Sequence, residues 1–302
     1  MLRSMFTAIG GLRNHQVMLD VTANNIANVN TVGYKAQRVA FESMMAQVMR
    51  GAAAPVPGQI GGSGPTEVGL GMTLNSIGSI MTQGSLQTTG QWSDVGLNGD
   101  GYFMVGTGLD ASDLVQSTSQ VQFTRAGNFT VDKDGYLTDQ HGQFVLGLQA
   151  PAPPQTPPIT FGTTLGALKL PPGASSISID QNGVMSYNLN GTTQVAGKLQ
   201  LAKFPNPAGL SRVGQNDLDD TANSGIFDPT DPTGATNGGN VIWGDANTQG
   251  LGSMASGTLE MSNVDLALEF TNMIVAQRGF QANTRVITTS DEVLQELVNL
   301  KR

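Results

Sequence analysis

Residues 2–26, LRSMFTAIGGLRNHQVMLDVTANNI, carry the pattern that decides the fold. Apolar positions repeat there at alternating spacings of three and four residues, which is typical of one face of a coiled-coil helix. The members of this stripe are Leu2, Met5, Ile9, Leu12, Gln16, Leu19, Ala23 and Ile26. Four asparagines follow between Asn24 and Asn30, and their side chains favour a turn that ends a helix. The sequence therefore predicts an amphipathic helix at the N-terminal end.

The other end of the chain shows the same spacing over a longer stretch. Ser262 or Asn263 is the expected N-cap, with Asp265 in the first turn. The positions of this second stripe are Leu266, Phe270, Met273, Gln277, Phe280, Thr284, Ile287, Asp291, Leu294 and Val298. An amphipathic helix is unstable alone, so we expect the two ends to pair with each other or with neighbouring molecules. The alternative is that both helices pack on the surface of one globule.

The middle of the chain is typical of β-structure. All 14 prolines lie between Pro55 and Pro232. Residues 100–105 and 198–204 are expected strands, and residues 129–138 and 177–186 are expected hairpins around Asp/Asn/Gly turns. The Pro-rich stretch 151–158 favours an extended linker, and residues 214–250 favour a long polar loop.

These patterns predict a mixed α and β fold with a discontinuous terminal domain. We expect residues 1–50 and 254–302 to form a helical coiled-coil domain, 51–90 an extended linker, and 91–253 a mainly-β outer domain. The ends differ in charge, since residues 1–50 carry net +3 and residues 254–302 carry net −2. Opposite signs favour pairing of the two ends, although the effect is small on exposed faces.

Composition excludes several classes of function. The net charge of −8 argues against a nucleic-acid binder. The chain has no cysteine, which excludes thiolate metal sites and a Cys nucleophile. It has two histidines, His15 and His141. The sequence contains no run of 18 apolar residues, so we expect no membrane-spanning helix. The N-terminal residues do not fit a cleavable signal peptide.

The motifs that suggest catalysis or ligand binding are weak. Residues 106–111 match a variant dinucleotide fingerprint, but no βαβ pattern follows. Asp132 and Asp134 begin a calcium-loop-like pattern without the later ligands, so a hairpin turn is favoured. We expect no cofactor, no metal site and no enzyme activity.

Several longer stretches resemble the bacterial flagellar rod–hook family. The N-terminal stretch ANNIANVNTVGYK spans residues 23–35, and LEMSNVDL spans residues 259–266. Further matches are MIVAQRGFQAN at 273–283, DVGLNGDGYF at 94–103 and FTRAGNF at 123–129. The signature positions are Asn24, Asn25, Ile26, Ala27, Asn28, Thr31, Gly33, Tyr34, Ser262, Asn263, Val264, Asp265, Gln277 and Arg278.

The resemblance implies a subunit that polymerises into a hollow helical tube. The terminal helices would form the inner coiled-coil layer, and the β domain would form the outer wall. Within the family the chain looks most like a short hook subunit, a flexible joint between rod and filament, with the straight distal rod as the alternative. The implied polymerisation interface consists of Leu2, Met5, Ile9, Leu12, Leu19, Ile26, Leu266, Phe270, Met273, Phe280, Ile287, Leu294 and Val298.

The resemblance also implies partners and a location. The partners would be further copies of the chain, the adjacent rod and hook–filament junction proteins, the hook cap during assembly, and the flagellar type III export apparatus. No nucleic acid and no membrane insertion are expected. The location would be the extracellular hook or the basal body, reached without signal-peptide cleavage. A secreted enzyme on a β scaffold and a monomeric adhesin are the competing interpretations, and neither explains helical stripes at both ends.

Overall fold

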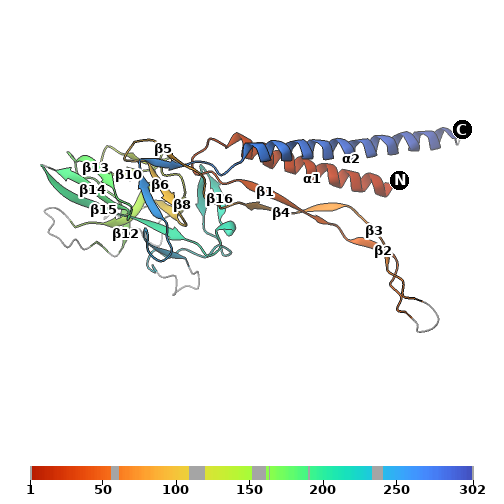
Figure 1. The fold of residues 1–302 in the computed structure, drawn as a ribbon, viewed down its shortest axis with the longest axis horizontal. Coiled ribbons are helices and arrows are strands. Elements are labelled where there is room, and N and C mark those ends of the chain that lie inside the picture. Colours follow the sequence, from red (N-terminus) through yellow and green to blue (C-terminus); the bar gives the residue numbers. More distant parts are fainter. Residues whose placement is uncertain are drawn as a thin grey trace. The chain divides into compact units, whose positions relative to one another are not determined.

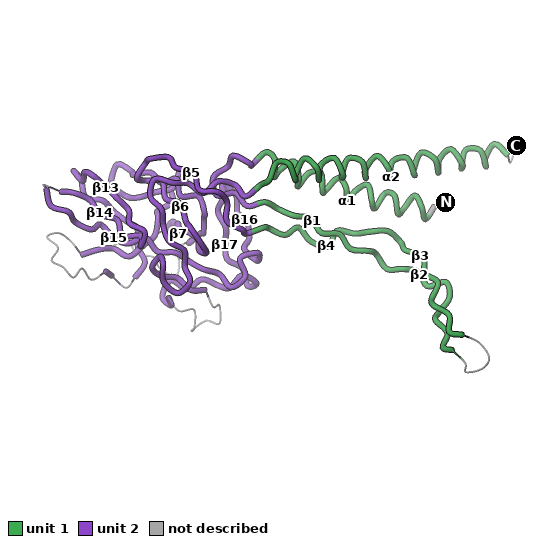
Figure 2. Tube along the Cα trace, viewed as in Figure 1, with its two compact units in different colours: residues 1–27, 36–80, 264–302 green, residues 28–35, 81–263 purple. Residues whose placement is uncertain are grey.

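The computed structural model describes residues 2–55, 61–108, 120–151, 161–162, 164–189, 191–232 and 241–300. The chain folds into two compact units (Figure 2). Unit 1 comprises residues 1–27, 36–80 and 264–302, and unit 2 comprises residues 28–35 and 81–263. Helices at both ends and a mainly-β middle confirm the predicted fold class.

Two long helices form one side of unit 1. Helix α1 spans Leu2–Ala27 and helix α2 spans Leu266–Leu300. They lie side by side and run in opposite directions (Figure 1). Helix α2 begins after Asp265, whose Oδ1 accepts the amides of Ala267 at 2.9 Å and Leu268 at 3.3 Å. Asp265 is therefore the N-cap, in place of the expected Ser262 or Asn263, because its carboxylate reaches the second and third amides of the helix.

Two antiparallel ribbons complete unit 1. Strand β1 (Gln37–Ser43) pairs with β4 (Met72–Ser79), and β2 (Ala46–Arg50) pairs with β3 (Thr66–Gly69). The β1–β4 ribbon packs on α1, where Asn14 Nδ2 donates to the Met72 carbonyl at 2.8 Å. The expected linker 51–90 is therefore partly strand, because β4 gains both a ladder with β1 and a packing surface on α1.

Unit 2 is built on one large sheet. In its described residues the sheet has 12 strands, with the central order β13-β14-β15-β11-β7-β8-β17-β16. The bounds of these eight strands are β7 Tyr102–Thr107, β8 Gln120–Thr124, β11 Phe144–Gln149, β13 Ser175–Ile179, β14 Val184–Leu189, β15 Thr192–Lys203, β16 Ser211–Gly214 and β17 Asp217–Asp219.

Short strands join this sheet or form separate pairs. Those that join the sheet are β9 (Thr130–Val131), β10 (Leu137–Thr138), β12 (Leu165–Ala167) and β18 (Ile242–Asp245). The separate pairs are β6 (Val95–Asn98) with β19 (Ser253–Ser256), and β5 (Leu86–Thr88) with β20 (Thr258–Glu260). A single 3₁₀ turn, η1 (Pro207–Gly209), precedes β16 in the described chain.

Strand β7 is buried on both faces and divides the core of unit 2. Phe103 and Val105 belong to one apolar cluster, and Tyr102 and Met104 belong to another. Successive side chains of a strand point to opposite faces, so the sheet carries a core on each side. This explains why residues 102–105 are a continuous apolar run.

The hairpins expected at 129–138 and 177–186 are confirmed, since β9 pairs with β10 and β13 pairs with β14. The expected loop 214–250 contains β17 and β18, which pair with β8 and β15. Residues 152–158 of the Pro-rich stretch and residues 109–111 of the dinucleotide-like motif lie outside the described residues.

Candidate functional site

Helices α1 and α2 meet along a seam in which small and polar residues lie beside half-buried apolar ones. An added Cβ on Gly11 would lie 2.7 Å from the Asn283 amide nitrogen, and one on Gly279 would lie 2.5 Å from the His15 ring. At the other end of α1, Asn25 Nδ2 donates to Glu269 Oε1 at 3.0 Å. The seam therefore brings the two helices together through glycines and hydrogen bonds.

The α2 side of this seam follows a heptad register of its own. Two sets of positions, each spaced by seven residues, are buried or half-buried. The first set is Glu269, Ala276, Asn283 and Ser290, and the second is Met273, Phe280, Ile287 and Leu294. The predicted stripe contains the second set and misses the first. A search for apolar residues cannot find the first set, because its members are a carboxylic acid, an amide and two small residues.

The predicted interface residues divide into two groups. Met273, Phe280, Ile287 and Leu294 lie in the seam, whereas Leu266, Phe270 and Val298 are 40%, 51% and 69% exposed. Of the predicted interface residues on α1, Met5, Ile9, Leu12, Leu19 and Ile26 are half-buried, and the side chain of Leu2 lies outside the description. Three of these, Ile9, Leu12 and Ile26, follow directly after the buried seam positions Ala8, Gly11 and Asn25.

Large apolar side chains are left exposed on both helices. Phe6 of α1 is 72% exposed. The exposed large apolar residues of α2 are Leu266, Leu268, Phe270, Ile274, Val275, Val286, Val293, Leu297, Val298 and Leu300. Exposed large apolar side chains in this number on one helix pair indicate an interaction surface.

The β2–β3 ribbon adds a second apolar surface in unit 1. Every residue of both strands is exposed. The exposed large apolar side chains on and beside the ribbon are Met44, Met45, Val48, Met49, Val68 and Leu70. A two-stranded ribbon without a cover is marginally stable in water, so this segment gains most from a partner.

A buried ion cluster lies in unit 2 and is centred on Glu260 at the end of β20. Lys35 Nζ donates to Glu260 Oε1 at 2.6 Å, and Arg125 Nη1 donates to Oε2 at 3.0 Å. The amide of Gly84 also donates to Oε1, at 2.9 Å. The Glu260 side chain is fully buried, and those of Lys35 and Arg125 are only 5% and 6% exposed.

Burial and charge oppose each other in this cluster. Burial by itself raises the pKa of Glu260, but the charges of Arg125 and Lys35 outweigh it and leave that pKa lowered. Burial lowers the pKa of Lys35 by more than Glu260 raises it. The carboxylate is thus stabilised by two buried cations. Each also donates to a backbone carbonyl at 2.9 Å, Lys35 to Thr82 and Arg125 to Gly99.

The N-terminal signature turn is built into the same cluster. The amide of Gly33 donates to the Glu260 carbonyl at 2.8 Å. Gly33 has φ of +70°, and an added Cβ would lie 2.7 Å from the Ala126 amide nitrogen. Only glycine fits this left-handed position against backbone. The turn that follows α1 is therefore joined to residues from the far end of the chain.

The other signature residues take up several positions. Asn25 and Tyr34 are buried, while Gln277 and Arg278 are exposed on α2. Asn28 Oδ1 accepts the Thr31 hydroxyl at 3.0 Å, and Asn263 Nδ2 donates to the Thr82 carbonyl at 3.1 Å.

Glu260 and Arg125 were not among the predicted site residues. One signal in the sequence was available: Glu260 is a lone acid in a short strand next to an apolar residue, Leu259.

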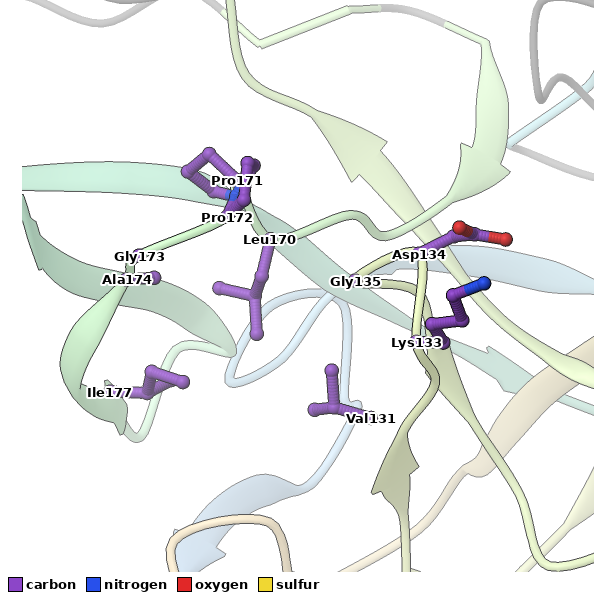
Figure 3. Close-up of a pocket in the computed structure, with 10 residues that line it drawn as sticks. All are labelled: Val131, Lys133, Asp134, Gly135, Leu170, Pro171, Pro172, Gly173, Ala174 and Ile177. Atoms are coloured by element: carbon purple, nitrogen blue, oxygen red, sulfur yellow. The ribbon is translucent and has the colours of Figure 1, made fainter.

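One pocket of unit 2 is lined mainly by apolar residues and backbone. Figure 3 shows this pocket of about 390 Å³, where Val131 and Leu170 point toward each other and Lys133 and Asp134 lie apart from them. Its described lining contains neither histidine nor a hydroxyl group. Across the described chain, no three His, Asp or Glu side chains are grouped so as to hold a metal ion. The described helices include none with the length and apolar character needed to cross a membrane.

Comparison with known proteins identifies the family. Residues 5–35 match the family described as "Flagella basal body rod protein", and residues 96–187 match "Flagellar hook protein FlgE/F/G D1 domain". Residues 255–300 match "Flagellar basal body rod FlgEFG protein C-terminal". The flagellar basal-body rod protein FlgG of Bacillus subtilis is 41% identical over 303 residues, covering 100% of both chains. The chain belongs to the flagellar rod and hook protein family.

Other relatives in this family carry both names. The flagellar hook protein FlgE of Borreliella burgdorferi is 30% identical over 456 residues, covering 100% of both chains. The flagellar basal-body rod protein FlgG of Caulobacter vibrioides is 30% identical over 307 residues, covering 99% of this chain and 100% of the relative. This rod and hook family member is thus a structural component of the flagellum and not an enzyme.

Proposed function

We propose that this chain polymerises through its terminal helices into a hollow helical tube of the flagellar axis, and that the tube is part of the rod. The observation that carries the proposal is the composition of the α1–α2 seam. Small and polar residues such as Gly11, Asn25 and Gly279 bring the helices together beside one row of half-buried apolar residues, while other large apolar residues stay exposed. The subunit therefore pairs its own helices and keeps an apolar surface for other copies.

A tube follows from the kind of contact that this surface makes. A contact of the exposed α2 residues of one copy with the β2–β3 ribbon of the next copy alone would be heterologous, because it joins two different surfaces. Heterologous contacts that do not close into a ring extend into a helical polymer. The exposed positions Leu266, Phe270 and Val298 are the members of the predicted interface that we assign to contacts between copies.

Assembly is tested by adding charge to α2. Phe270 and Gln277 are both exposed on this helix, so Phe270→Asp and Gln277→Asp add the same charge to the same element. Loss of one buried Phe contact costs roughly 2 kcal/mol, which raises the critical concentration for polymerisation about 30-fold. We expect sedimentation to show this rise for Phe270→Asp only. Equal polymerisation of both variants, with α2 still helical by circular dichroism, would contradict the proposed interface.

Assignment to the rod rests on the length of the relatives. The rod protein of Bacillus subtilis aligns with this 302-residue chain over 303 residues. The alignment with the hook protein of Borreliella burgdorferi extends over 456 residues. A subunit of rod length lacks the additional segments of that longer hook protein.

The hook is the second candidate. A specific observation favours it: hook proteins of the family also align with the whole of this chain, at 30% identity in Borreliella burgdorferi.

Location separates the two candidates. An antibody raised against unit 2 would be applied to isolated hook–basal bodies and observed by electron microscopy. Label on the straight shaft supports the rod assignment. Label on the curved segment outside the envelope would overturn it in favour of the hook, and label on neither would contradict both.

A further inference from the structure

The β16–β17 hairpin lies at one end of the central strand order of unit 2. Strand β17 pairs with β8 through Asp217 opposite Thr124 and Leu218 opposite Phe123. The turn of the hairpin contains Asn216, with φ of +68°. The attachment of the hairpin to the sheet is short, so it depends strongly on the few side chains between β17 and β8.

The same hairpin holds the chain that leaves α1. Asn216 Nδ2 donates to the Val32 carbonyl at 3.0 Å, and Arg212 Nη2 donates to the Lys35 carbonyl at 2.6 Å. The Arg212 guanidinium also lies 5.2 Å from the centre of the Tyr34 ring. Residues 32–35 are thus held from the hairpin side by two hydrogen bonds and a cation–π contact.

Asp217 is a buried carboxylate at the base of this hairpin. Asp217 is only 2% exposed. Oδ2 accepts Gln143 Nε2 at 3.1 Å, but Oδ1 is buried and receives no hydrogen bond within the described structure. A buried ionised oxygen without a donor is costly, and protonation of the carboxyl group removes that cost.

The groups that face Asp217 come from several elements. The turn between β10 and β11 contributes Asp139 and His141, and Asp139 Oδ1 accepts the His141 amide at 2.6 Å. Strand β8 contributes the uncharged side chain of Thr124. On the hairpin itself the other charged groups are Arg212 and Asp219, and Arg212 is engaged with residues 34 and 35. Burial first, and then the charge of Asp139, raise the pKa of Asp217 to about 6, although the charge of His141 and hydrogen bonds with Thr124 and Gln143 lower it.

We propose that the β16–β17 hairpin is a pH-dependent clamp on residues 32–35. When Asp217 is protonated, β17 stays paired with β8, and Asn216 and Arg212 keep their hydrogen bonds to residues 32–35. When Asp217 is ionised, the buried charge favours detachment of β17 from β8, and the grip on residues 32–35 weakens with it. The clamp lies within unit 2 and does not rest on the proposed polymerisation.

Hydrogen exchange on the full-length chain tests the clamp. Protection of the Gly33 amide and of residues 212–218, corrected for the intrinsic effect of pH, should fall up to about 10-fold between pH 5 and pH 7.5. Strand β14 (Val184–Leu189) is the internal reference and should not change. In Asp217→Asn the protection should stay high at every pH. A flat profile in the unaltered chain, or a slope that survives in Asp217→Asn, would overturn the proposal.

Two further variants test the coupling. Asn216→Gly keeps the left-handed backbone but removes the hydrogen bond to Val32. Residues 212–218 should still respond to pH, while Gly33 loses most of its response. Asp219→Asn alters an exposed carboxylate of the same strand and should keep the response of both segments. An unchanged response of Gly33 in Asn216→Gly, or its loss in Asp219→Asn, would contradict the clamp.

Discussion

Replacement of Glu260 by Gln keeps the shape of the side chain and removes its charge. In the native chain the carboxylate of Glu260 accepts Lys35 at 2.6 Å, Arg125 at 3.0 Å and the Gly84 amide at 2.9 Å. The variant leaves two cations buried without their counter-ion, and it places an amide N–H₂ group beside donors. Removing one partner of a buried ion pair costs about 3–5 kcal/mol.

The expected loss is large relative to the stability of a domain. Domains have unfolding free energies of roughly 5–15 kcal/mol. For a unit of this size each kcal/mol lowers Tm by about 2–4 °C, so Glu260→Gln should lower Tm by roughly 10 °C. Both tryptophans, Trp92 and Trp243, lie in unit 2. Tryptophan fluorescence during urea or thermal unfolding therefore reports on the unit that contains the cluster.

An exposed ion pair in the same unit is the matched control. Lys203 and Asp100 are 3.1 Å apart, and their side chains are 34% and 73% exposed. Asp100→Asn should cost less than about 1 kcal/mol, because water screens this pair. The double variant Glu260→Gln with Lys35→Met should recover part of the lost unfolding free energy, since it removes one of the two cations left without a counter-ion. A cost below 1 kcal/mol for Glu260→Gln, or an equal cost for Asp100→Asn, would refute this account of the cluster.

Three further predictions follow from other contacts. Gly33→Ala should destabilise unit 2 by about 2 kcal/mol or more in urea unfolding, because a left-handed residue cannot place a Cβ against the Ala126 backbone; unchanged stability would contradict the required glycine. Phe280→Asp should lower the thermal stability of the helix pair, measured by circular dichroism at 222 nm, because Phe280 lies in the seam. Phe270→Asp is the control at an exposed position and should leave this thermal stability unchanged. The contribution of Asp217 to stability should fall as pH rises from about 4 to 6 and then level off, because the folded state raises the pKa of Asp217 from 3.8 to about 6 and so binds its proton more tightly than the unfolded state. Asp217→Asn should therefore gain up to about 3 kcal/mol at pH 7, and no gain in urea unfolding would exclude the buried charge as the cause.

The sequence by itself determined the elements and the class of fold. The heptad stripes predicted a helix at each end, and the Asp/Asn/Gly turns predicted hairpins such as β9–β10, because these signals arise from neighbours in the chain. The terminal signatures were sufficient to recognise the family. They also included Gly33, Tyr34 and Asn25, whose contacts the sequence could not assign.

Tertiary structure decided which residues meet. The seam between α1 and α2 uses Gly11, Asn283 and Glu269 beside the apolar stripe, because close approach of two backbones selects small residues and hydrogen bonds over large apolar side chains. The ion cluster joins Lys35, Arg125 and Glu260, which are up to 225 positions apart. No local pattern specifies such a pairing, because its energy comes from burial that exists only after the chain has folded.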